Sequence, residues 1–238
     1  MKCCIVLPTY NERDNIGKLL KTLLEIFDTI KDFDMNVLVV DDNSPDGTQE
    51  VVKKFLKGKR VSMITGEKHG LGAAYIRGFK HAIEKLKADV LFEMDADFSH
   101  DPKDIPKFLK EIKNGYGFVI GSRYIPGGDT PDWGFDRKLI SSGGNFFARV
   151  IAGLYKVKDC TSGYRAIRSS LIKKINLNNL KVKGYSFQMN LLYEAVKNKA
   201  KIKEVPIIFV DRHVGTSKIE RKDVYEFFIN SFKLRFGK

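Results

Sequence analysis

The sequence predicts an α/β fold in which a mostly parallel sheet is covered by helices on both faces. Short apolar runs alternate with longer stretches whose apolar residues recur at helical spacing. The runs are apolar throughout, which is typical of strands buried on both faces. Polar and acidic residues gather at the carboxyl ends of the runs. In such sheets, ligands lie outside the carboxyl ends of the strands.

The apolar runs predict strands at residues 3–7, 37–40, 61–64, 89–95 and 118–120, and a later run at 205–210 is also of strand length. Pro8 is expected to stop the first strand, because proline lacks the N–H that a strand donates. Helical spacing predicts helices at residues 16–27, 70–87 and 105–112, and a short helix from Thr48. Asn11 and Thr48 are candidate caps for the helices that follow them.

The chain of 238 residues carries a formal net charge of +13. Such a charge favours an anionic partner: nucleic acid, an anionic membrane surface or a phosphorylated substrate. Three cysteines without metal-ligand spacing favour a reducing, cytosolic setting. No apolar run approaches the roughly 20 residues that span a bilayer, and no secretory signal is evident, so we expect no transmembrane segment.

Two carboxylates, Asp95 and Asp97, follow the fourth predicted strand. They project to the same side if the extended conformation continues through them. Carboxylates so placed repel each other unless a cation lies between them, and hard oxygen ligands favour Mg²⁺ or Mn²⁺. A solvated Asp-rich turn explains this stretch equally well, because Ser99, Asp101 and Pro102 are ordinary turn residues.

Four polar segments are expected to meet at the carboxyl edge of the sheet, at residues 8–12, 41–42, 66–72 and 95–97. Glycines at 70 and 72 could bring backbone N–H groups to a phosphate, but a plain turn is favoured there. The sequence has no Walker A motif and no Gly-x-Gly-x-x-Gly after the first strand, which argues against a standard dinucleotide site.

The second half of the chain differs in character. Residues 122–136 are rich in Gly, Pro and Asp and predict a long loop of a kind that is often functional. Residues 137–174 carry nine Lys or Arg against one acid, around an apolar helical face that runs from Phe146 to Tyr155. A second such helix is predicted at 222–236. Each helix alone fits an ordinary packed element, but two of them beside one basic region favour contact with a membrane surface.

With these segments, the sequence resembles glycosyltransferase family 2 and, within it, the dolichyl-phosphate mannose synthases. The resemblance extends from residue 2 to about residue 218. It is carried by Pro-Thr-Tyr-Asn-Glu, Met-Asp-Ala-Asp, Thr-Ser-Gly-Tyr-Arg and further segments, at residues 8–12, 39–48, 94–100, 121–124, 137–141, 161–165, 184–189, 209–212 and 215–218.

The resemblance implies a GT-A fold, with a Rossmann-like sheet and a C-terminal acceptor-binding part, in one catalytic domain of residues 1–238. Residues 1–121 would form the nucleotide-binding half, and residues 122–238 the acceptor- and membrane-facing half. The nucleoside would be held by Pro8, Tyr10, Glu12, Val40 and Asp42. The ribose and diphosphate would lie at Asp95, Ala96 and Asp97. The metal would be held by Asp95, Asp97 and Ser99.

The other residues that the resemblance implicates are basic or polar. Phosphates of the donor or acceptor would be bound by Arg123, Arg212 and Lys218. The lipid phosphate would face Arg123, Arg137 and Ser141. Gln188 lies in a segment similar to one beside the sugar. The catalytic residues would be Asp95, Asp97, Arg123 and Arg212.

The activity implied is inverting transfer of mannose from GDP-mannose to dolichyl or another polyprenyl phosphate, with Mg²⁺ or Mn²⁺ as the cofactor. The enzyme would be peripheral, at the cytoplasmic face of a membrane that it contacts through amphipathic helices, and small membrane subunits are further candidate partners. A fragment of a longer chain is the alternative. Ser99 stands where some relatives carry Gln, so we expect water to complete the metal's ligands. Asn190 stands where relatives often carry a carboxylate, so the sugar contacts are left open.

Three other interpretations compete with this one. A polyprenyl-phosphate glucosyltransferase that uses UDP-glucose is the nearest, because Tyr10, Glu12 and Asp42 do not separate guanine from uracil. A processive polysaccharide synthase is disfavoured, since the only tryptophan, Trp133, lies outside any Gln-x-x-Arg-Trp motif. A nucleic-acid-binding module would explain the charge but not the four polar strand ends, so no nucleic-acid partner is expected.

Overall fold

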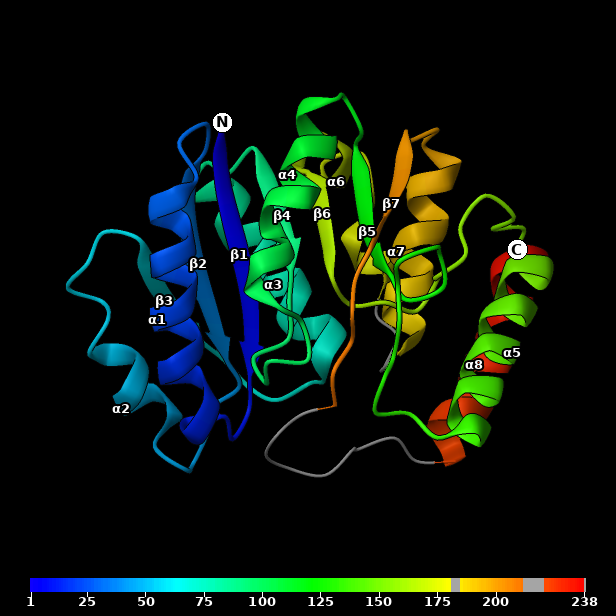
Figure 1. Cartoon of the computed structure of the whole chain (residues 1–238), viewed down its shortest axis with the longest axis horizontal. Helices are drawn as coiled ribbons and strands as arrows, with labels where there is room; N and C mark the ends of the chain where they lie inside the picture. The colour runs from blue at the N-terminus through cyan, green and yellow to red at the C-terminus, as the bar shows by residue number, and fades with distance from the viewer. Residues whose placement is uncertain (181–184, 212–220, 238) are drawn as a thin grey trace.

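The computed structural model describes residues 1–180, 185–211 and 221–237, and it describes the backbone but not the side chains of residues 178–179, 185 and 221–228. The described residues form one seven-stranded sheet in the order β3-β2-β1-β4-β6-β5-β7 (Figure 1). The strands are β1 (Lys2–Thr9), β2 (Asp34–Asp41), β3 (Val61–Thr65), β4 (Val90–Glu93), β5 (Phe118–Ser122), β6 (Arg165–Arg168) and β7 (Ile202–Pro206). Neighbours are parallel except where β6 pairs with β4 and β5. The predicted α/β, mostly parallel architecture is confirmed.

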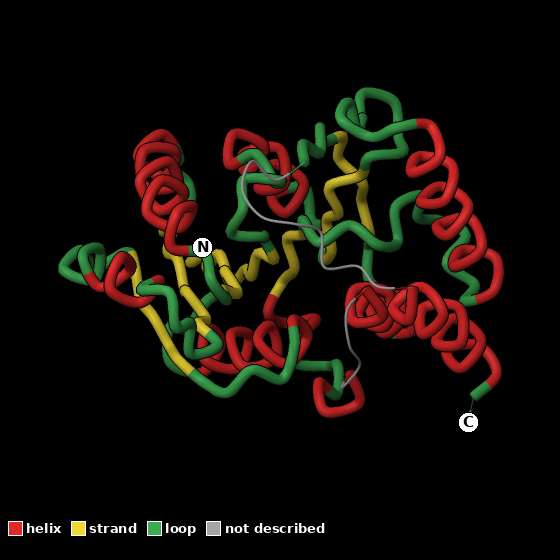
Figure 2. Tube along the Cα trace, turned by 90° about the horizontal axis from the view of Figure 1, so that it is seen from below, coloured by secondary structure: helices red, strands yellow, loops and turns green. Residues whose placement is uncertain are grey.

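Helices cover both faces of the sheet (Figure 2). On one face lie α1 (Arg13–Thr29), α2 (Thr48–Lys53) and α4 (Ile105–Lys113), and on the other lie α3 (Leu71–Glu84) and α7 (Tyr185–Lys197). The remaining helical segments are α5 (Phe135–Ile151), α6 (Ser169–Ile172), α8 (Arg221–Phe236) and the 3₁₀ turns η1 (Pro102–Asp104) and η2 (Leu177–Leu180).

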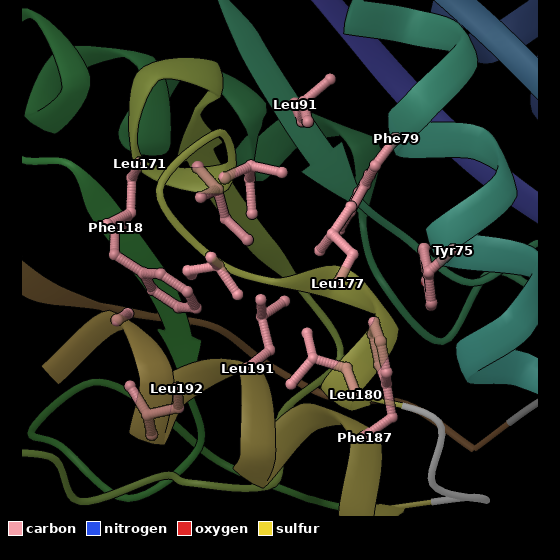
Figure 3. Close-up of a cluster of buried hydrophobic side chains, with 14 of the residues drawn as sticks. Tyr75, Phe79, Leu91, Phe118, Leu171, Leu177, Leu180, Phe187, Leu191 and Leu192 are labelled. Atoms are coloured by element: carbon pink, nitrogen blue, oxygen red, sulfur yellow. The ribbon is translucent and has the colours of Figure 1, made fainter. Parts of the chain in front are cut away.

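Two hydrophobic cores, one on each face of the sheet, explain why the strand sequences are apolar throughout. Successive residues of a strand point to opposite faces, so Ile5 and Val6 of β1 join different cores. Figure 3 shows one of these cores, in which Phe79 of α3, Phe118 of β5 and Leu191 of α7 are all fully buried. A strand with a core on both sides needs apolar side chains at every position.

The strands differ from the prediction at three places. β1 continues through Pro8 to Thr9, because β4 stops pairing with β1 at Val6 and leaves Pro8 at a local edge, where proline is tolerated. β6 was not predicted, because its four residues include two arginines rather than an apolar run. β7 covers Ile202–Pro206 and not residues 205–210, because it ends where its partner β5 ends, with Ser122 opposite Pro206.

The helices also differ from the prediction in the second half. α5 begins at Phe135, inside the predicted loop, directly after Gly134 and with Asp136 in its first turn, where a carboxylate is favourable. It ends at Ile151, and Gly153 then adopts a left-handed φ of 72°. Leu154 and Tyr155 therefore lie beyond the helix that was expected to include them. α7 was not predicted as a helix.

α5 and α8 pack beside each other at the end of the molecule beyond β7 (Figure 1). The rings of Phe147 in α5 and Phe232 in α8 meet edge to face, with centroids 5.6 Å apart. Within the described part of the chain, no helix combines the length and the apolar character needed to cross a membrane.

Candidate active site

The carboxyl ends of the parallel strands meet at one edge of the sheet, as the sequence predicted. Thr9, the last residue of β1, lies opposite Asp41, the last of β2, and Asp41 lies opposite Thr65, the last of β3. β4 ends at Glu93 beside Val6 of β1, so the Asp-rich segment emerges at the same edge. The four polar segments are thus brought together by strand pairing.

Hydrogen bonds connect residues 8–12 to residues 41–48. Asn11 has a left-handed φ of 61°, and its N–H donates to Ser44 Oγ at 3.0 Å. The N–H of Glu12 donates to Thr48 Oγ1 at 3.0 Å. The prediction that Asn11 and Thr48 cap the following helices is wrong, since Glu12 and Gly47 occupy the cap positions and neither makes a side-chain cap bond.

The two adjacent carboxylates after β2 have different environments. Asp41 is fully buried and accepts hydrogen bonds from the Thr9 hydroxyl, the Ser44 N–H and hydroxyl, and the Gln49 amide. Asp41 therefore holds its own loop in place. Asp42, the predicted nucleoside ligand, is 7% exposed and forms an ion pair with the Arg77 guanidinium of α3.

Two cations that the sequence analysis did not single out lie beside the predicted nucleoside residues. Arg77 reaches Asp42 because the next residue, Gly78, lets α3 approach the sheet closely: a Cβ there would lie 2.5 Å from a valine methyl of β1. Lys68 Nζ lies 3.5 Å from the ring centroid of Tyr10, a cation–π contact. In the sequence, the one sign that Arg77 reaches the site was the glycine that directly follows this lone arginine in an apolar helix.

The remaining predicted nucleoside residues lie at the same edge with different exposure. Pro8, Tyr10 and Glu12 are half-buried, and the Asn15 amide donates to Glu12 Oε2 at 3.0 Å. Val40 is fully buried in a hydrophobic core, so only its backbone can face a nucleotide.

The acidic segment after β4 bends instead of continuing the strand. β4 ends at Glu93, and Phe98 adopts a left-handed φ of 65°. The extended conformation that would place Asp95 and Asp97 on one side therefore does not persist. Asp97 is 5% exposed, and its Oδ1 accepts the N–H of Ser99 at 3.0 Å. Ala96 between them is buried.

Ser99 fits the role of a metal ligand. Its hydroxyl oxygen is buried and has no hydrogen-bond partner among the described residues, which is costly unless a ligand or water satisfies it. With Asp95 and Asp97 it offers hard oxygen donors, the set that Mg²⁺ and Mn²⁺ prefer. Within the described ranges, no three or more His, Cys, Asp or Glu side chains gather in a group that could hold a metal.

His100 fixes the backbone of the acidic segment. Its Nδ1 accepts the N–H of Asp95 at 3.1 Å, and its ring stacks on Tyr164 with centroids 4.8 Å apart. Burial lowers the pKa of His100 to about 4, although the charge of Asp97 opposes that shift. His100 is therefore neutral at physiological pH and acts as a hydrogen-bond acceptor at this nitrogen.

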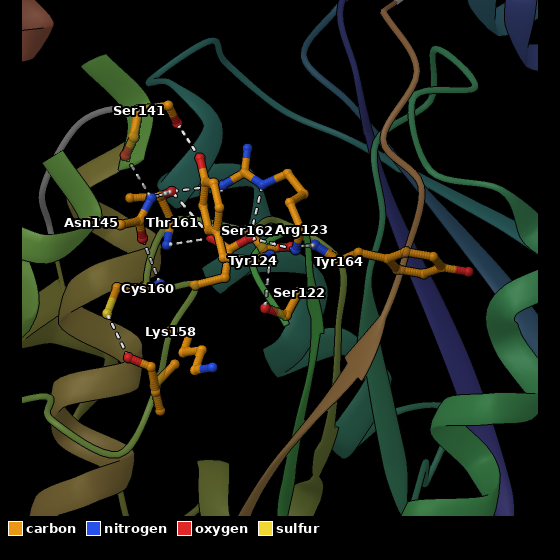
Figure 4. Close-up of polar contacts among 12 residues, drawn as sticks. Ser122, Arg123, Tyr124, Ser141, Asn145, Lys158, Cys160, Thr161, Ser162 and Tyr164 are labelled. Atoms are coloured by element: carbon orange, nitrogen blue, oxygen red, sulfur yellow. Dashed lines mark hydrogen bonds and ion pairs between the residues drawn. The ribbon is translucent and has the colours of Figure 1, made fainter. Parts of the chain in front are cut away.

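Arg123, a predicted phosphate ligand, is anchored by a buried ion pair (Figure 4). Its Nε and Nη2 donate to the two carboxylate oxygens of Asp159 at 2.8 and 2.7 Å, and Nη2 also donates to Thr161 Oγ1. The side chains of Arg123 and Asp159 are 7% and 0% exposed. Two parallel hydrogen bonds of this kind fix the direction of a guanidinium.

Ser141, a predicted contact of the lipid phosphate, belongs to the same network. The Tyr124 hydroxyl and the Ser141 hydroxyl are 2.6 Å apart, with Tyr124 as the donor (Figure 4). Asn145 Nδ2 donates to the Ser141 carbonyl and to Thr161 Oγ1. These bonds connect α5 to the segment that carries Asp159.

Arg137, the other predicted acceptor residue, is half-exposed near the start of α5. Its Nη1 lies 2.6 Å from Asp211 Oδ2, and its guanidinium lies over the Trp133 ring at 4.2 Å. The Trp133 indole N–H also donates to Asp211. Arg212 and Lys218, both predicted phosphate ligands, lie outside the described residues.

Gln188 is brought close to the acidic segment. A Cβ built on Gly163 would lie 3.7 Å from Gln188 Nε2, 3.8 Å from Asp95 Oδ2 and 3.5 Å from His100 Cε1. The absence of a side chain at Gly163 lets these three residues converge. Gln188 is 3% exposed, and its Oε1 lacks a hydrogen-bond partner within the described ranges.

Comparison with known proteins shows which family the chain belongs to. Residues 4–176 match the family described as glycosyl transferase family 2. The chain is 40% identical to the undecaprenyl-phosphate mannosyltransferase of Micrococcus luteus, over 97% of this chain and 92% of that protein. It is 37% identical to the dolichol-phosphate mannosyltransferase of Pyrococcus furiosus, over 98% of this chain and 64% of that protein.

Among solved structures, the chain resembles glucosyl-3-phosphoglycerate synthase from Mycobacterium tuberculosis, crystallised with Mn²⁺ and UDP-glucose. The TM-score is 0.68 at 19% identity, over 99% of this chain and 79% of that one. The likeness shows a shared GT-A fold.

The family match and the similarity to named mannosyltransferases show that the chain is a glycosyltransferase. The chain belongs to glycosyl transferase family 2. The family resemblance seen in the sequence is therefore confirmed.

Proposed function

We propose that this enzyme transfers mannose from GDP-mannose to the phosphate of dolichol or another polyprenol, with inversion at the anomeric carbon. The observation that supports this most is the 40% identity, over 97% of the chain, to a protein named undecaprenyl-phosphate mannosyltransferase. The meeting of Asp42 and Arg77 with the acidic segment at one sheet edge suits a nucleoside diphosphate sugar.

In the proposed reaction, an oxygen of the acceptor phosphate attacks the anomeric carbon, and the bond from that carbon to GDP breaks with its electron pair leaving on GDP. The acceptor phosphate is already anionic at neutral pH, so no strong general base is needed. Asp95, Asp97 and Ser99 would hold Mg²⁺ or Mn²⁺, which would stabilise the charge on the departing diphosphate. Arg123 and Arg212 would position phosphate groups.

The acceptor phosphate is proposed to lie between the sheet edge and α5. Arg123 directly follows β5, whereas Arg137 and Ser141 come from the first two turns of α5. The hydrogen bonds around Thr161 hold these two elements in fixed relation. Lys218 is proposed as a further phosphate ligand, and Gln188 as a sugar contact beside Asp95. On this view residues 1–121 hold the donor and residues 122–238 hold the acceptor.

Donor and acceptor are tested by incubating the protein with radiolabelled GDP-mannose, or with radiolabelled UDP-glucose, together with polyprenyl phosphate and Mn²⁺. We expect label from GDP-mannose to enter the organic phase, and EDTA to abolish that transfer because it removes the metal that would stabilise the departing diphosphate. If only UDP-glucose transferred its label, the donor would be UDP-glucose and not GDP-mannose. If neither transferred label, the proposed function would be refuted.

We further propose that α5 and α8 hold the protein against the cytoplasmic face of a membrane, where small membrane subunits could join it. An apolar stripe on α5, defined as Phe135, Leu139, Phe146 and Val150, recurs at helical spacing. These side chains are 79, 60, 64 and 43% exposed. Phe232 and Phe236 of α8 extend the exposed apolar surface, with their rings stacked 6.4 Å apart. Of the basic residues at 137–174, Arg165 is fully buried and cannot contribute.

Removing part of the stripe is expected to weaken membrane binding. Each large apolar side chain that enters the interface contributes about 1.5–3 kcal/mol, so Leu139→Ser/Phe146→Ser should bind anionic phosphatidylcholine–phosphatidylglycerol vesicles at least about tenfold more weakly. Vesicle sedimentation measures this. Leu56→Ser is the matched control, since Leu56 is 39% exposed and follows α2, far from α5 (Figure 1). Equal binding by all three proteins would count against the interfacial role.

A further inference from the structure

A glutamate and an arginine are fully buried side by side in the sheet. Glu93 of β4 and Arg165 of β6 lie directly opposite each other, and neither side chain is exposed. Glu93 Oε2 and Arg165 Nε are 3.7 Å apart, and within the described residues neither carboxylate oxygen nor Nε has a hydrogen-bond partner. Burial raises the pKa of Glu93 to about 8, although the charge of Arg165 opposes that shift. Buried ionisable groups with incomplete hydrogen bonding cost much of what their attraction gains, so this pair is a weak source of stability.

The other nitrogens of the guanidinium bind two backbone carbonyls from distant segments. Arg165 Nη1 donates to the Gln188 carbonyl at 2.6 Å, and Nη2 donates to the Cys160 carbonyl at 3.0 Å. Gln188 belongs to α7, and Cys160 directly precedes the Thr161–Gly163 segment. One planar side chain therefore connects the end of β4, the first turn of α7 and that segment, a geometry that lysine cannot reproduce.

These three segments are the ones that meet at Asp95. Glu93 precedes Asp95 by two residues, and Gly163 lies where Asp95 and Gln188 converge. The Glu93–Arg165 pair therefore lies next to the segments that bring Asp95 of the candidate metal site close to Gln188. No other arginine of β6 does this: Arg168, at the opposite end of the strand, donates to the carbonyls of Ile112 and Tyr116.

We propose that Glu93 and Arg165 are positioning residues that set the placement of Asp95 relative to Gln188. Glu93 lies against the guanidinium at the strand end, and the guanidinium, through its bonds to the Gln188 and Cys160 carbonyls, holds α7 and the Cys160 segment in place beside Asp95. Neither residue touches the nucleotide sugar. This inference rests on the proposed function for the metal at Asp95 and for its kinetic readout.

The test is the double variant Glu93→Leu/Arg165→Met, which removes both ionisable groups and keeps the volume, because either single change would leave the other group buried without its partner. We expect thermal stability close to that of the wild type. We expect Mn²⁺ binding in the presence of GDP, followed by the EPR signal of the free ion, to weaken about 10- to 100-fold, as for other groups that orient metal ligands. In mannosyl transfer, kcat should fall by a similar factor while KM for GDP-mannose changes little, since Tyr10 and Asp42 follow two other strands, β1 and β2.

Arg168→Met is the matched control, because it removes carbonyl hydrogen bonds from the same strand away from the site. It should lower Tm without changing Mn²⁺ affinity or kcat. Unchanged Mn²⁺ affinity and kcat in the double variant would overturn the inference, and so would a double variant that fails to fold, because the pair would then be a stabilising element. If the wild type binds Mn²⁺ and GDP but forms no lipid-linked product, the proposed function is refuted. The positioning role of Glu93 and Arg165 is then still decided by the Mn²⁺ titration.

Discussion

Replacing Asp97 by alanine is expected to lower metal-dependent transfer about a thousandfold, which corresponds to about 4 kcal/mol of transition-state stabilisation. The Asp97 carboxylate is nearly buried at the edge where the diphosphate is proposed to lie, and it accepts the N–H of Ser99, whose buried hydroxyl has no partner among the described residues. Without it, the metal that stabilises the leaving group loses a charged ligand. The measurement is kcat for transfer over a range of Mn²⁺ concentrations.

The fold of this variant should persist, because Asp97 lies beyond the end of β4, and the hydrogen bond that it accepts from the Ser99 N–H is local. Circular dichroism checks this. Asp101→Asn is the control: Asp101 is exposed, four residues further on, and its side chain accepts only the N–H of Lys103 in η1. Wild-type turnover by Asp97→Ala would remove Asp97 from the metal site.

Replacing Asp159 by alanine is expected to destabilise the fold by about 3–5 kcal/mol, the usual cost of leaving one partner of a buried ion pair alone. Arg123 would remain at 7% exposure without its carboxylate, and the N–H groups of Thr161 and Ser162 would lose their acceptor. Urea unfolding measures the loss. Asp28→Ala breaks the exposed pair with Arg60 and should have little effect. Equal midpoints for the two variants would contradict the structural role of Asp159.

The Asp159 carboxylate should also make the free energy of unfolding depend on pH. Burial alone would raise the pKa of Asp159, but the charge of Arg123 and the hydrogen bonds that Arg123 and Thr161 donate lower it below its ordinary value. A group whose pKa is lower in the folded state stabilises the fold above its unfolded pKa of about 3.9 and loses that contribution as pH falls through the folded pKa. The free energy of unfolding should therefore decline in acid, and the decline should be shallower in Asp159→Asn.

The strands that the sequence predicted are those buried on both faces, such as β1 and β2, because two-sided burial leaves an apolar run that can be recognised locally. β6 could not be predicted in this way. Its sequence, Arg-Ala-Ile-Arg, is a strand because β4 and β5 flank it and supply hydrogen bonds on both sides. α7 likewise gave no clear periodic signal, and it was noted only for the segment around Gln188.

The candidate site was predictable where its residues directly follow strands, as with Asp42, Asp95 and Asp97. The partners of those residues were not, because they depend on contacts between distant positions: Arg77 is 35 residues from Asp42, and Asp159 is 36 residues from Arg123. One signal for Asp159 was present, since it is the single acid among nine basic residues at 137–174. A solitary acid in so basic a region is expected to have a buried cationic partner.

The antiparallel strand β6 also bears on how this fold can diversify. β5 and β6 are adjacent in the sheet, yet the chain travels through residues 123–164, including α5 and the Asp159 segment, before it returns from one to the other. Because this connection begins and ends on adjacent strands, replacing it with a connection of different length would leave every strand pairing unchanged. If α5 binds the acceptor as proposed, changes within α5 can alter selectivity for the molecule that receives the sugar while the strand pairings stay the same.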